Sequence, residues 1–529
     1  MPEQEPVIEH SNERFHIELR GFDHIPEAER NMSLPQVDFL WLGTSVNLLS
    51  FTLGALTIAM GLSLWAAFLA CLVGTLLYFL VAMGSVATVR AGLPVSTLSR
   101  AAFGLRGNGF NAFVSWIVSV VFEVINIVFG VEALLALVRL LGWEEPGSLG
   151  KLLAVVLQLV LCGGIAVLGH ATMVWFQRIF AVSIGAALLL VLGFTLPKVD
   201  WLHAAVPHGA LSTGTMLAAF LTACAVIASN PLSFLFNGPD WVRYLPAATP
   251  RRAILSHVFW GSFSPSILLT LMGAWCATLG DMSDPVAGIK PFVPGWLFII
   301  YIVSVIGGSL ANNVPTYYSS GLTLQALGLN VHRYVATALD VAVSTVIALY
   351  VLFIQDFTTA LNDFIALMVM WVGPYGGVWI ADAWMRRGTY DSLAIHGRGA
   401  CAHRYWGWRG LNLAGLASLA TGMLLSALTM RSPLYDGPIA VALFRMVPAA
   451  RVLISFPAGA YHMRKSKFAV YTLAGCLPWN FTLIYLGWWL GSSWDSVVGL
   501  FRYVNVLAYA LLVLLLIWIF FKMKGRRVG

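Results

Sequence analysis

The sequence predicts an all-α polytopic membrane protein, and two observations carry that prediction: its composition and the length of its apolar segments. Of the 529 residues, 59% are hydrophobic and 10% are charged, whereas a soluble domain carries about 25% charged residues to keep its surface hydrated. A helix needs about 20 mostly apolar residues to cross the hydrocarbon core of a bilayer. Segments of that length recur through the whole chain, so the expected solvent is lipid.

The apolar segments predict eleven spans in the first 430 residues, and the rest of the chain brings the expected total to about 12–14 transmembrane helices. The polar start of the chain is too charged for a cleavable signal peptide. We divide the chain into an N-terminal tail (1–35), a membrane core (36–440) and a C-terminal membrane segment (441–529). The spans are expected near residues 38–61, 64–89, 110–138, 150–170, 174–196, 214–237, 253–279, 292–320, 334–354, 358–384 and 408–430.

Basic residues gather on one side of this zigzag. The loops on the side of the N-terminus hold sixteen of them, and the opposite loops hold five. Since basic loops stay in the cytoplasm, we expect a cytoplasmic N-terminus in a multi-pass protein of the plasma (inner) membrane. This asymmetry accounts for the net charge of +7 without a nucleic-acid partner. The first set is Arg14, Arg20, Arg30, Arg90, Arg100, Arg106, Arg178, Arg243, Arg251, Arg252, Arg333, Arg386, Arg387, Arg398, Arg404 and Arg409; the second is Arg139, Lys151, Lys198, Lys290 and Arg431.

Two spans carry residues that a straight membrane helix avoids. Span 1 contains the small and hydroxylic stretch 50–57, and span 6 contains Pro231, which lacks an N–H and clashes with the preceding turn. Each alone is better explained by a packing kink whose hydroxyls bond back to their own helix. The two interruptions lie five spans apart, which is the spacing of a 5+5 inverted repeat whose broken first helices build a midplane site. The pair therefore predicts a broken-helix transporter fold.

Enzymatic chemistry has no support in the sequence. We find no phosphate-binding Walker loop, no cluster with metal-ligand spacing and no catalytic triad. The six cysteines are scattered, mostly within apolar segments, where buried and unreactive thiols are expected. We therefore predict a protein that is not an enzyme and that needs neither an organic cofactor nor a structural metal.

Four stretches resemble nucleobase–cation symporter family 1, which includes purine–cytosine permeases and hydantoin and allantoin transporters. They lie in the loop after span 2, in the loop after span 6, in span 8 and in span 10. The resemblance implies import of a flat heterocycle (cytosine or a purine, with allantoin and hydantoin as further options) together with Na⁺ or H⁺. Beyond this small-molecule substrate we expect only membrane lipids as partners, and the oligomeric state stays open. The stretches are 92–94 with 100–107, 237–246, 312–319 with 324–328, and 373–377 with Asp382 and Tyr390.

The C-terminal segment departs from that family. Residues 444–451, 455–459 and 487–491 with Trp494 resemble the C-terminal half of DedA (SNARE-associated) membrane proteins, a family of lipid-carrier translocases. An alternative function is therefore a lipid-carrier translocase or membrane scaffold that acts through this segment.

The substrate site is expected between spans 3 and 8. Phe122 and Asn126 are four residues apart and share one helix face, which suits stacking and paired hydrogen bonds to a heterocycle. The resemblance implies the same, since an aromatic residue four positions before an amide is the family's pattern in span 3. Span 8 is equivalent to span 3 in the repeat and offers Asn312 and Asn313. The alternative for Asn126 is an amide that joins two helices.

Further candidates follow from the resemblance. Gln177 falls where purine–cytosine members show an acidic residue, so an ionisable group is missing there. The position of the stacking Trp of hydantoin-type members falls on Pro231, beside Asn230, and Phe234 is then the candidate for the second wall.

A proton is favoured over sodium as the coupling ion. Glu123 is an ionisable side chain in mid-span, where the choice lies between a functional group and a paired structural one, and burial would favour its protonated form. The family's sodium site would use span-1 carbonyls near Gly54 and Thr57 with two hydroxyls of span 8. Those positions are Ile306 and Gly307 here, and Ser304 is near but out of register.

Overall fold

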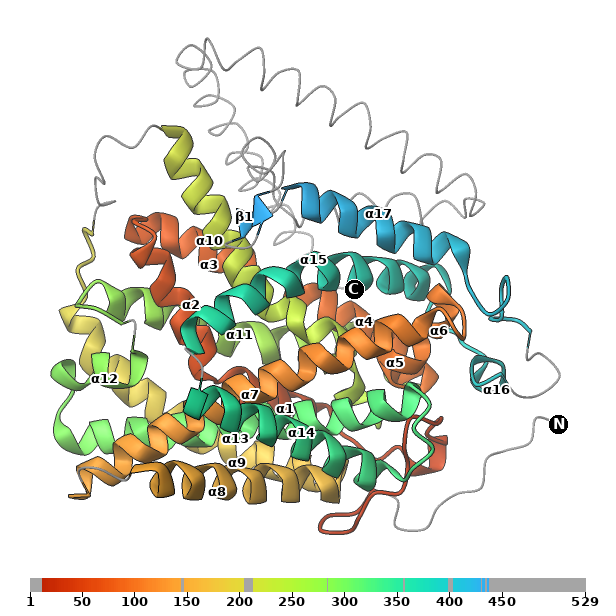
Figure 1. Cartoon of the computed structure of the whole chain (residues 1–529), viewed down its shortest axis with the longest axis horizontal. Coiled ribbons are helices and arrows are strands. Elements are labelled where there is room, and N and C mark those ends of the chain that lie inside the picture. The colour runs from red at the N-terminus through yellow and green to blue at the C-terminus, as the bar shows by residue number, and fades with distance from the viewer. Residues whose placement is uncertain are drawn as a thin grey trace, which may run out of the picture.

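The computed structural model describes residues 12–143, 147–203, 213–282, 284–354, 357–397, 403–429, 431–432 and 435–436. Within these residues the fold is a bundle of long helices with one two-residue hairpin, β1 (Arg431–Ser432) and β2 (Tyr435–Asp436) (Figure 1). The predicted membrane segment 441–529 lies outside the described residues.

The first repeat follows the predicted order. Span 1 is split into α1 (Leu34–Ser45) and α2 (Leu48–Ala59), and span 2 into α3 (Leu64–Thr75) and α4 (Tyr78–Ala91). Spans 3, 4 and 5 are α7 (Asn108–Leu140), α8 (Gly147–Leu168) and α9 (His170–Thr195). The short elements are η1 (Glu27–Glu29), α5 (Val95–Leu98), α6 (Arg100–Phe103) and η2 (Leu196–Lys198).

The second repeat also follows the predicted order of spans. Span 6 is α10 (Thr213–Ser233), followed by the 3₁₀ turns η3 (Phe234–Phe236) and η4 (Gly238–Val242). Spans 7 to 10 are α11 (Arg251–Ala277), α13 (Gly295–Ala326), α14 (Arg333–Ile354) and α15 (Phe357–Met385), and α17 (Leu413–Thr429) follows. The short elements are α12 (Pro285–Gly288), η5 (Lys290–Phe292) and α16 (Ser392–Ile395). Each predicted span overlaps a helix, and in the described part of the chain eight helices, or nine with the bent pair of span 1, can cross a membrane.

The break in span 1 lies earlier than predicted. α1 and α2 meet at an angle of 54° across Val46 and Asn47, whereas α2 is continuous through the stretch 50–57. The side chain of Asn47 caps α2 by accepting a hydrogen bond from the Ser50 N–H, 3.0 Å away. Thr52 and Thr57 donate to carbonyls of their own helix. The hydroxyls therefore preserve the helix, and the break falls where the cap begins.

Span 6 changes its geometry where the sequence predicted. Pro231 lies in the last turn of α10, after which the chain tightens into η3. Asn230 donates a hydrogen bond from Nδ2 to Oγ of Ser50 at 2.9 Å, so the irregular parts of spans 1 and 6 are joined side by side, as predicted from the repeat.

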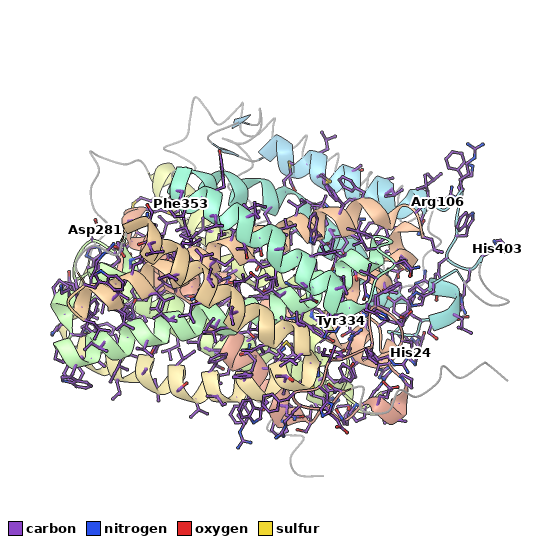
Figure 2. The ribbon with its side chains drawn as sticks, turned by 60° about the horizontal axis from the view of Figure 1, so that its bottom comes forward. His24, Arg106, Asp281, Tyr334, Phe353 and His403 are labelled. Carbon is purple, nitrogen blue, oxygen red and sulfur yellow. The ribbon has the colours of Figure 1, made fainter. Side chains whose placement is uncertain are left out.

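The two ends of the bundle differ in the loops that they hold. In Figure 2, Tyr334 and Phe353 mark the two ends of α14, with Arg106 at the end of Tyr334 and Asp281 at the end of Phe353. His24 and His403 also lie at the end of Tyr334. The loops predicted to share the side of the N-terminus therefore gather at one end.

The described part of the N-terminal tail packs into that same end. Glu18 is 2% exposed and accepts hydrogen bonds from the hydroxyls of Tyr244 (2.6 Å) and Tyr318 (3.1 Å). It also forms ion pairs with Arg243 (3.4 Å) and Arg333 (3.6 Å). Burial raises the pKa of Glu18, but the two arginines more than offset this and hold the pKa below its usual value of 4.5.

Candidate functional site

A small cavity lies where the breaks of spans 1 and 6 meet spans 3 and 8. It leaves about 10 Å³ in which the centre of a water molecule can lie, which is room for roughly one water. The described conformation is therefore closed to a ring-sized ligand. Four of the predicted site residues share this cavity; its lining is Asn47, Leu49, Phe122, Asn230, Ser233, Phe234, Asn237, Asn312 and Thr316.

Two side-chain amides join spans 3 and 8 beside the cavity, which Asn312 lines and Asn126 does not. Asn126 donates from Nδ2 to Oδ1 of Asn312 at 2.8 Å and also to the carbonyl of Phe122 at 2.8 Å. Asn312 donates from Nδ2 to the carbonyl of Thr44 at 2.9 Å, at the end of α1. The prediction that Asn126 and Asn312 face each other is confirmed by this contact, and their role in substrate binding stays a prediction.

Phe234 and Phe122 both line the cavity, but they differ in how tightly their rings are packed. Phe234 is 5% exposed and packs against Trp41, Tyr78 and Trp241, at centroid distances of 5.7, 6.1 and 5.6 Å. Phe122 is only half-buried. The chain therefore supplies one side of the cavity packed among three aromatic rings and one that is partly exposed. Trp41 on α1 was not singled out by the sequence, because an aromatic residue in an apolar helix has no distinguishing pattern.

Gln177 and Asn313 do not line the cavity but support its walls. Pro315 has no N–H for the carbonyl of Ala311, and Gln177 donates to that carbonyl from Nε2 at 2.5 Å. Asn313 donates from Nδ2 to the carbonyl of Glu123 at 3.1 Å. Both amides therefore satisfy backbone carbonyls beside Asn312 or Phe122.

The positions considered for sodium serve helix packing in this conformation. Gly54 lies so close to α11 that an added Cβ would stand 1.8 Å from the carbonyl oxygen of Thr270. Thr57 donates to the carbonyl of Gly54 at 2.7 Å, and Ser304 donates to its own helix at Ile300, also at 2.7 Å. At the break itself, α13 presents Gly308, whose Cβ would stand 2.8 Å from the Val46 oxygen. Glycine supplies no side-chain oxygen to a cation there.

Glu123 faces a second acid, Asp340 on α14. Both side chains are completely buried and lie within hydrogen-bonding reach of each other. The indole of Trp116 donates to Oδ1 of Asp340 at 2.7 Å. As two carboxylates neither acid can donate. The hydroxyls of Ser320 and Ser344 lie beside Glu123, but within the described residues no hydrogen bond reaches either Glu123 oxygen or Oδ2 of Asp340. A single proton held between the two acids would supply the missing donor. No pattern in the sequence pairs residue 340 with residue 123.

Comparison with known proteins agrees with this geometry. Residues 24–449 match the family described as "Permease for cytosine/purines, uracil, thiamine, allantoin". The chain belongs to this family. It is 26% identical over 394 residues to YxlA of Bacillus subtilis (strain 168), whose name assigns it to the purine–cytosine permeases; the match covers 72% of this chain and 82% of YxlA. The protein is thus a multi-pass transporter and not an enzyme.

The fold has a solved counterpart. Mhp1, described as a nucleobase-cation-symport-1 family transporter in a closed conformation with bromovinylhydantoin bound, superposes with a TM-score of 0.62. Sequence identity is 18%, and the match covers 88% of this chain and 99% of Mhp1. This likeness confirms the predicted broken-helix inverted-repeat fold.

The C-terminal resemblance rests on shorter matches. A stretch of 53 residues is 45% identical to undecaprenyl phosphate transporter A of Bacillus subtilis (strain 168), covering 10% of this chain and 27% of that protein. The match supports a likeness of the C-terminal segment to such proteins over a fraction of their length.

Proposed function

We propose that this transporter imports a nucleobase or a related flat heterocycle across the plasma membrane, with its N-terminus in the cytoplasm. The observation that carries the proposal is the pairing of two phenylalanines with two amides around one cavity between the broken spans. Aromatic faces bind flat rings, and amides offer both a donor and an acceptor to the edge of a base. The name of the matched family, which includes cytosine, purines, uracil and allantoin, supports the same substrate class.

The substrate would replace the contacts that now fill the site. Because the cavity holds roughly one water, a base enters only if the hydrogen bond between Asn126 and Asn312 opens. Phe122, the less buried wall, then moves aside, and the ring stacks against Phe234. A ligand without hydrogen-bonding edges would leave the opened amides unsatisfied, which costs about 1–3 kcal/mol for each buried group.

We propose further that a proton drives uptake, held between Glu123 and Asp340. Glu123 directly follows Phe122, and its carbonyl accepts the hydrogen bond of Asn313, the neighbour of Asn312. The acid pair therefore lies next to the segments that carry Asn126 and Asn312. We call these two asparagines the amide clamp. Gly308, which faces the break of span 1, supports a proton rather than sodium as the coupling ion. A bound sodium ion needs several oxygen ligands, and glycine has no side-chain oxygen to offer.

Uptake by the purified full chain in proteoliposomes tests the proposal. Radiolabelled cytosine, hypoxanthine, uracil, allantoin and a hydantoin are offered under an imposed proton gradient, and then under a sodium gradient at equal pH. We expect one of these heterocycles to accumulate with the proton gradient alone. Accumulation with sodium alone would overturn the coupling, and uptake of none of the five would overturn the substrate class.

A second candidate function rests on a single observation, the short match of the C-terminal segment to undecaprenyl phosphate transporter A. A lipid-carrier translocase or scaffold that acts through this segment would lose its function on truncation after residue 435. The import of a heterocycle should survive that truncation, because the cavity is built entirely from earlier residues. Uptake measured on the truncated chain separates the two functions.

A further inference from the structure

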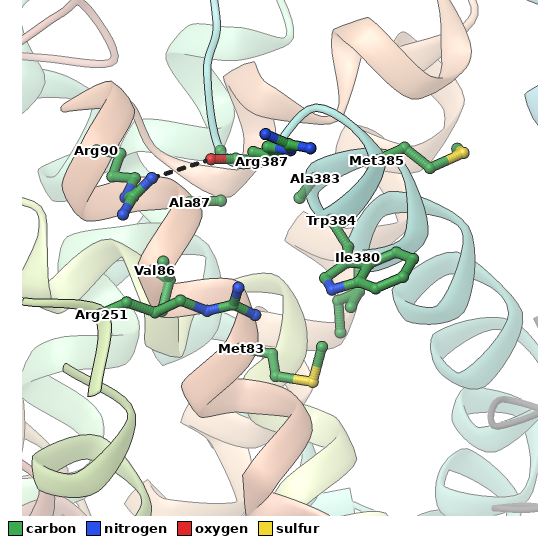
Figure 3. A pocket seen from close by; sticks show the side chains of 11 residues that line it. Met83, Val86, Ala87, Arg90, Arg251, Ile380, Ala383, Trp384, Met385 and Arg387 are labelled. Carbon is green, nitrogen blue, oxygen red and sulfur yellow. Dashed lines mark hydrogen bonds between the residues drawn. The ribbon is translucent and has the colours of Figure 1, made fainter. Parts of the chain in front are cut away.

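A second and larger cavity opens at the end of the bundle that holds Tyr334 and Arg106. It encloses about 300 Å³ between α4, the start of α11 and the end of α15 (Figure 3). No residue of the transport cavity takes part in it; its lining is Met83, Val86, Ala87, Arg90, Arg251, Ile380, Ala383, Trp384, Met385, Arg387 and Gly388.

The lining is polar at one end and apolar at the other. Arg90 lies in the last turn of α4, Arg251 is the first residue of α11, and Arg387 follows the end of α15. Met83 and Ile380 lie two turns deeper in α4 and α15, about 10 Å along the helix axis at 1.5 Å per residue. The cavity therefore has a cationic rim at the level of the helix ends and an apolar floor that leads toward the middle of the membrane.

The three arginines have no acidic partner in the part of the chain that the structure describes. The nearby carboxylate of Asp382 is already bound by Arg386 at 2.8 Å and by the hydroxyl of Tyr390. Arg90 donates only to the backbone carbonyl of Arg387, at 3.4 Å. Exposed arginines are often simply hydrated, but here three of them line one concave surface.

The backbone at Arg387 adds a second observation. Arg387 has a φ of +55°, and Gly388, with a φ of +72°, donates to the carbonyl of Ala383. Such a helix end favours glycine, because a residue with a Cβ is strained in this conformation. The chain nevertheless places an arginine there, and Figure 3 shows Arg387 beside Arg90 at the rim of the cavity.

We propose that this cavity binds an anionic phospholipid. The phosphate would lie among Arg90, Arg251 and Arg387, because guanidinium groups match phosphate oxygens with paired hydrogen bonds. One acyl chain would follow Met83 and Ile380 into the bilayer. Basic pockets between membrane helices on the cytoplasmic side are suited to such headgroups. The bound lipid would bridge three helices and so stabilise the protein, whatever the transported substrate.

Lipid binding by the purified full chain in neutral detergent tests this proposal by native mass spectrometry. The ligands are phosphatidylglycerol, phosphatidylcholine with the same chains, glycerophosphoglycerol and inorganic phosphate. We expect one phosphatidylglycerol to bind at least about tenfold more tightly than phosphatidylcholine, because both lipids carry the phosphate but only phosphatidylcholine adds a quaternary ammonium, which the three arginines repel. Equal affinity for the two lipids would overturn the proposal. Displacement of the lipid by millimolar phosphate or by the free headgroup would identify a site for soluble anions instead.

A matched pair of double variants locates the site. Arg251→Gln with Arg387→Gln removes two charges from the rim, and Arg14→Gln with Arg252→Gln removes two exposed charges outside it. The rim variant should lose the preference for phosphatidylglycerol and the rise in melting temperature that the lipid gives, while the control keeps both. Identical binding by the two variants would contradict the assignment. All four side chains are exposed, so folding is retained, and Arg251→Gln alone provides a milder form of the test.

Discussion

Two completely buried glutamates lie in opposite electrostatic settings. Glu18, at the end of the bundle, is surrounded by Arg243, Arg333 and two tyrosine hydroxyls. Glu123, in the middle of span 3, faces another acid, Asp340, with the hydroxyls of Ser320 and Ser344 beside it, and no cation pairs with it in the described residues. The first setting fixes a negative charge, and the second leaves a place for a proton. Burial alone therefore says little about the role of an acid, and its partners decide that role.

The largest expected effect is on stability, at Glu18. Replacing it by Gln leaves two buried arginines without their carboxylate, which costs about 3–5 kcal/mol of folding free energy. Thermal unfolding of the purified protein measures the loss. The control is Glu132→Gln, which removes an exposed carboxylate from α7 and should leave the melting temperature unchanged. Equal melting temperatures for the two variants would show that Glu18 is not a structural charge.

The difference in stability between the wild type and Glu18→Gln depends on pH, and the lowered pKa of Glu18 sets its direction. The pKa of Glu18 lies below 4.5 in the folded protein, so its stabilisation is fully present above that value. As the pH falls below about 4.3, the unfolded chain takes up a proton before the folded one does, and the stabilisation is lost. The difference in stability between the wild type and Glu18→Gln should therefore shrink as the solution is acidified.

At Glu123 we expect the reverse pattern, a loss of coupling with little loss of stability. Gln resembles the protonated acid, so Glu123→Gln should fold normally and still exchange labelled for unlabelled substrate. Accumulation driven by a proton gradient should fall to equilibration, and Asp340→Asn should do the same. Proton-driven accumulation by Glu123→Gln at the wild-type level would remove this acid from the coupling mechanism.

A smaller effect is expected at the amide clamp. Asn312→Ala should weaken substrate binding by about 1–3 kcal/mol, roughly tenfold to more than a hundredfold, because it removes one of the two facing amides. Asn313→Ala is the matched control, since its amide bonds the Glu123 carbonyl outside the cavity. Equilibrium binding and melting temperatures are measured for both. Normal binding by Asn312→Ala together with a loss at Asn313→Ala would place the substrate on the other helix face.

The smallest effect is expected at the positions considered for sodium. Ser304→Ala and Thr57→Val remove hydroxyls that bond only to their own helices, so both variants should transport within about twofold of the wild type. A sodium-dependent loss of uptake in either variant would reopen a sodium site near span 1.

The spans and the facing amides could be predicted because they depend on composition and on repeat geometry. Each of the eleven spans predicted from hydropathy overlaps a helix in the described residues, and the equivalence of spans 3 and 8 placed Asn126 near Asn312. The break in span 1 was misplaced because Val46 and Asn47 include no proline or glycine. Its position follows instead from the cap that Asn47 gives to α2.

The partners of buried charges could not be predicted, because they come from distant parts of the chain. The N-terminal tail was predicted from its polar composition. Nothing in its sequence indicates that Glu18 contacts Arg333, 315 residues away. Asp340 is 217 positions from Glu123, and no periodic pattern connects them. Such pairs become visible only when the helices are assembled.

The near-absence of free space at the transport cavity has a kinetic consequence. A ligand cannot collide productively with a site that holds about one water molecule. On the proposed function, the ligand would have to wait for the hydrogen bond between Asn126 and Asn312 to break, so the waiting time would be set by the protein and not by the ligand. At high ligand concentration the rate of association should level off at the opening rate of the amide pair, well below the diffusion limit.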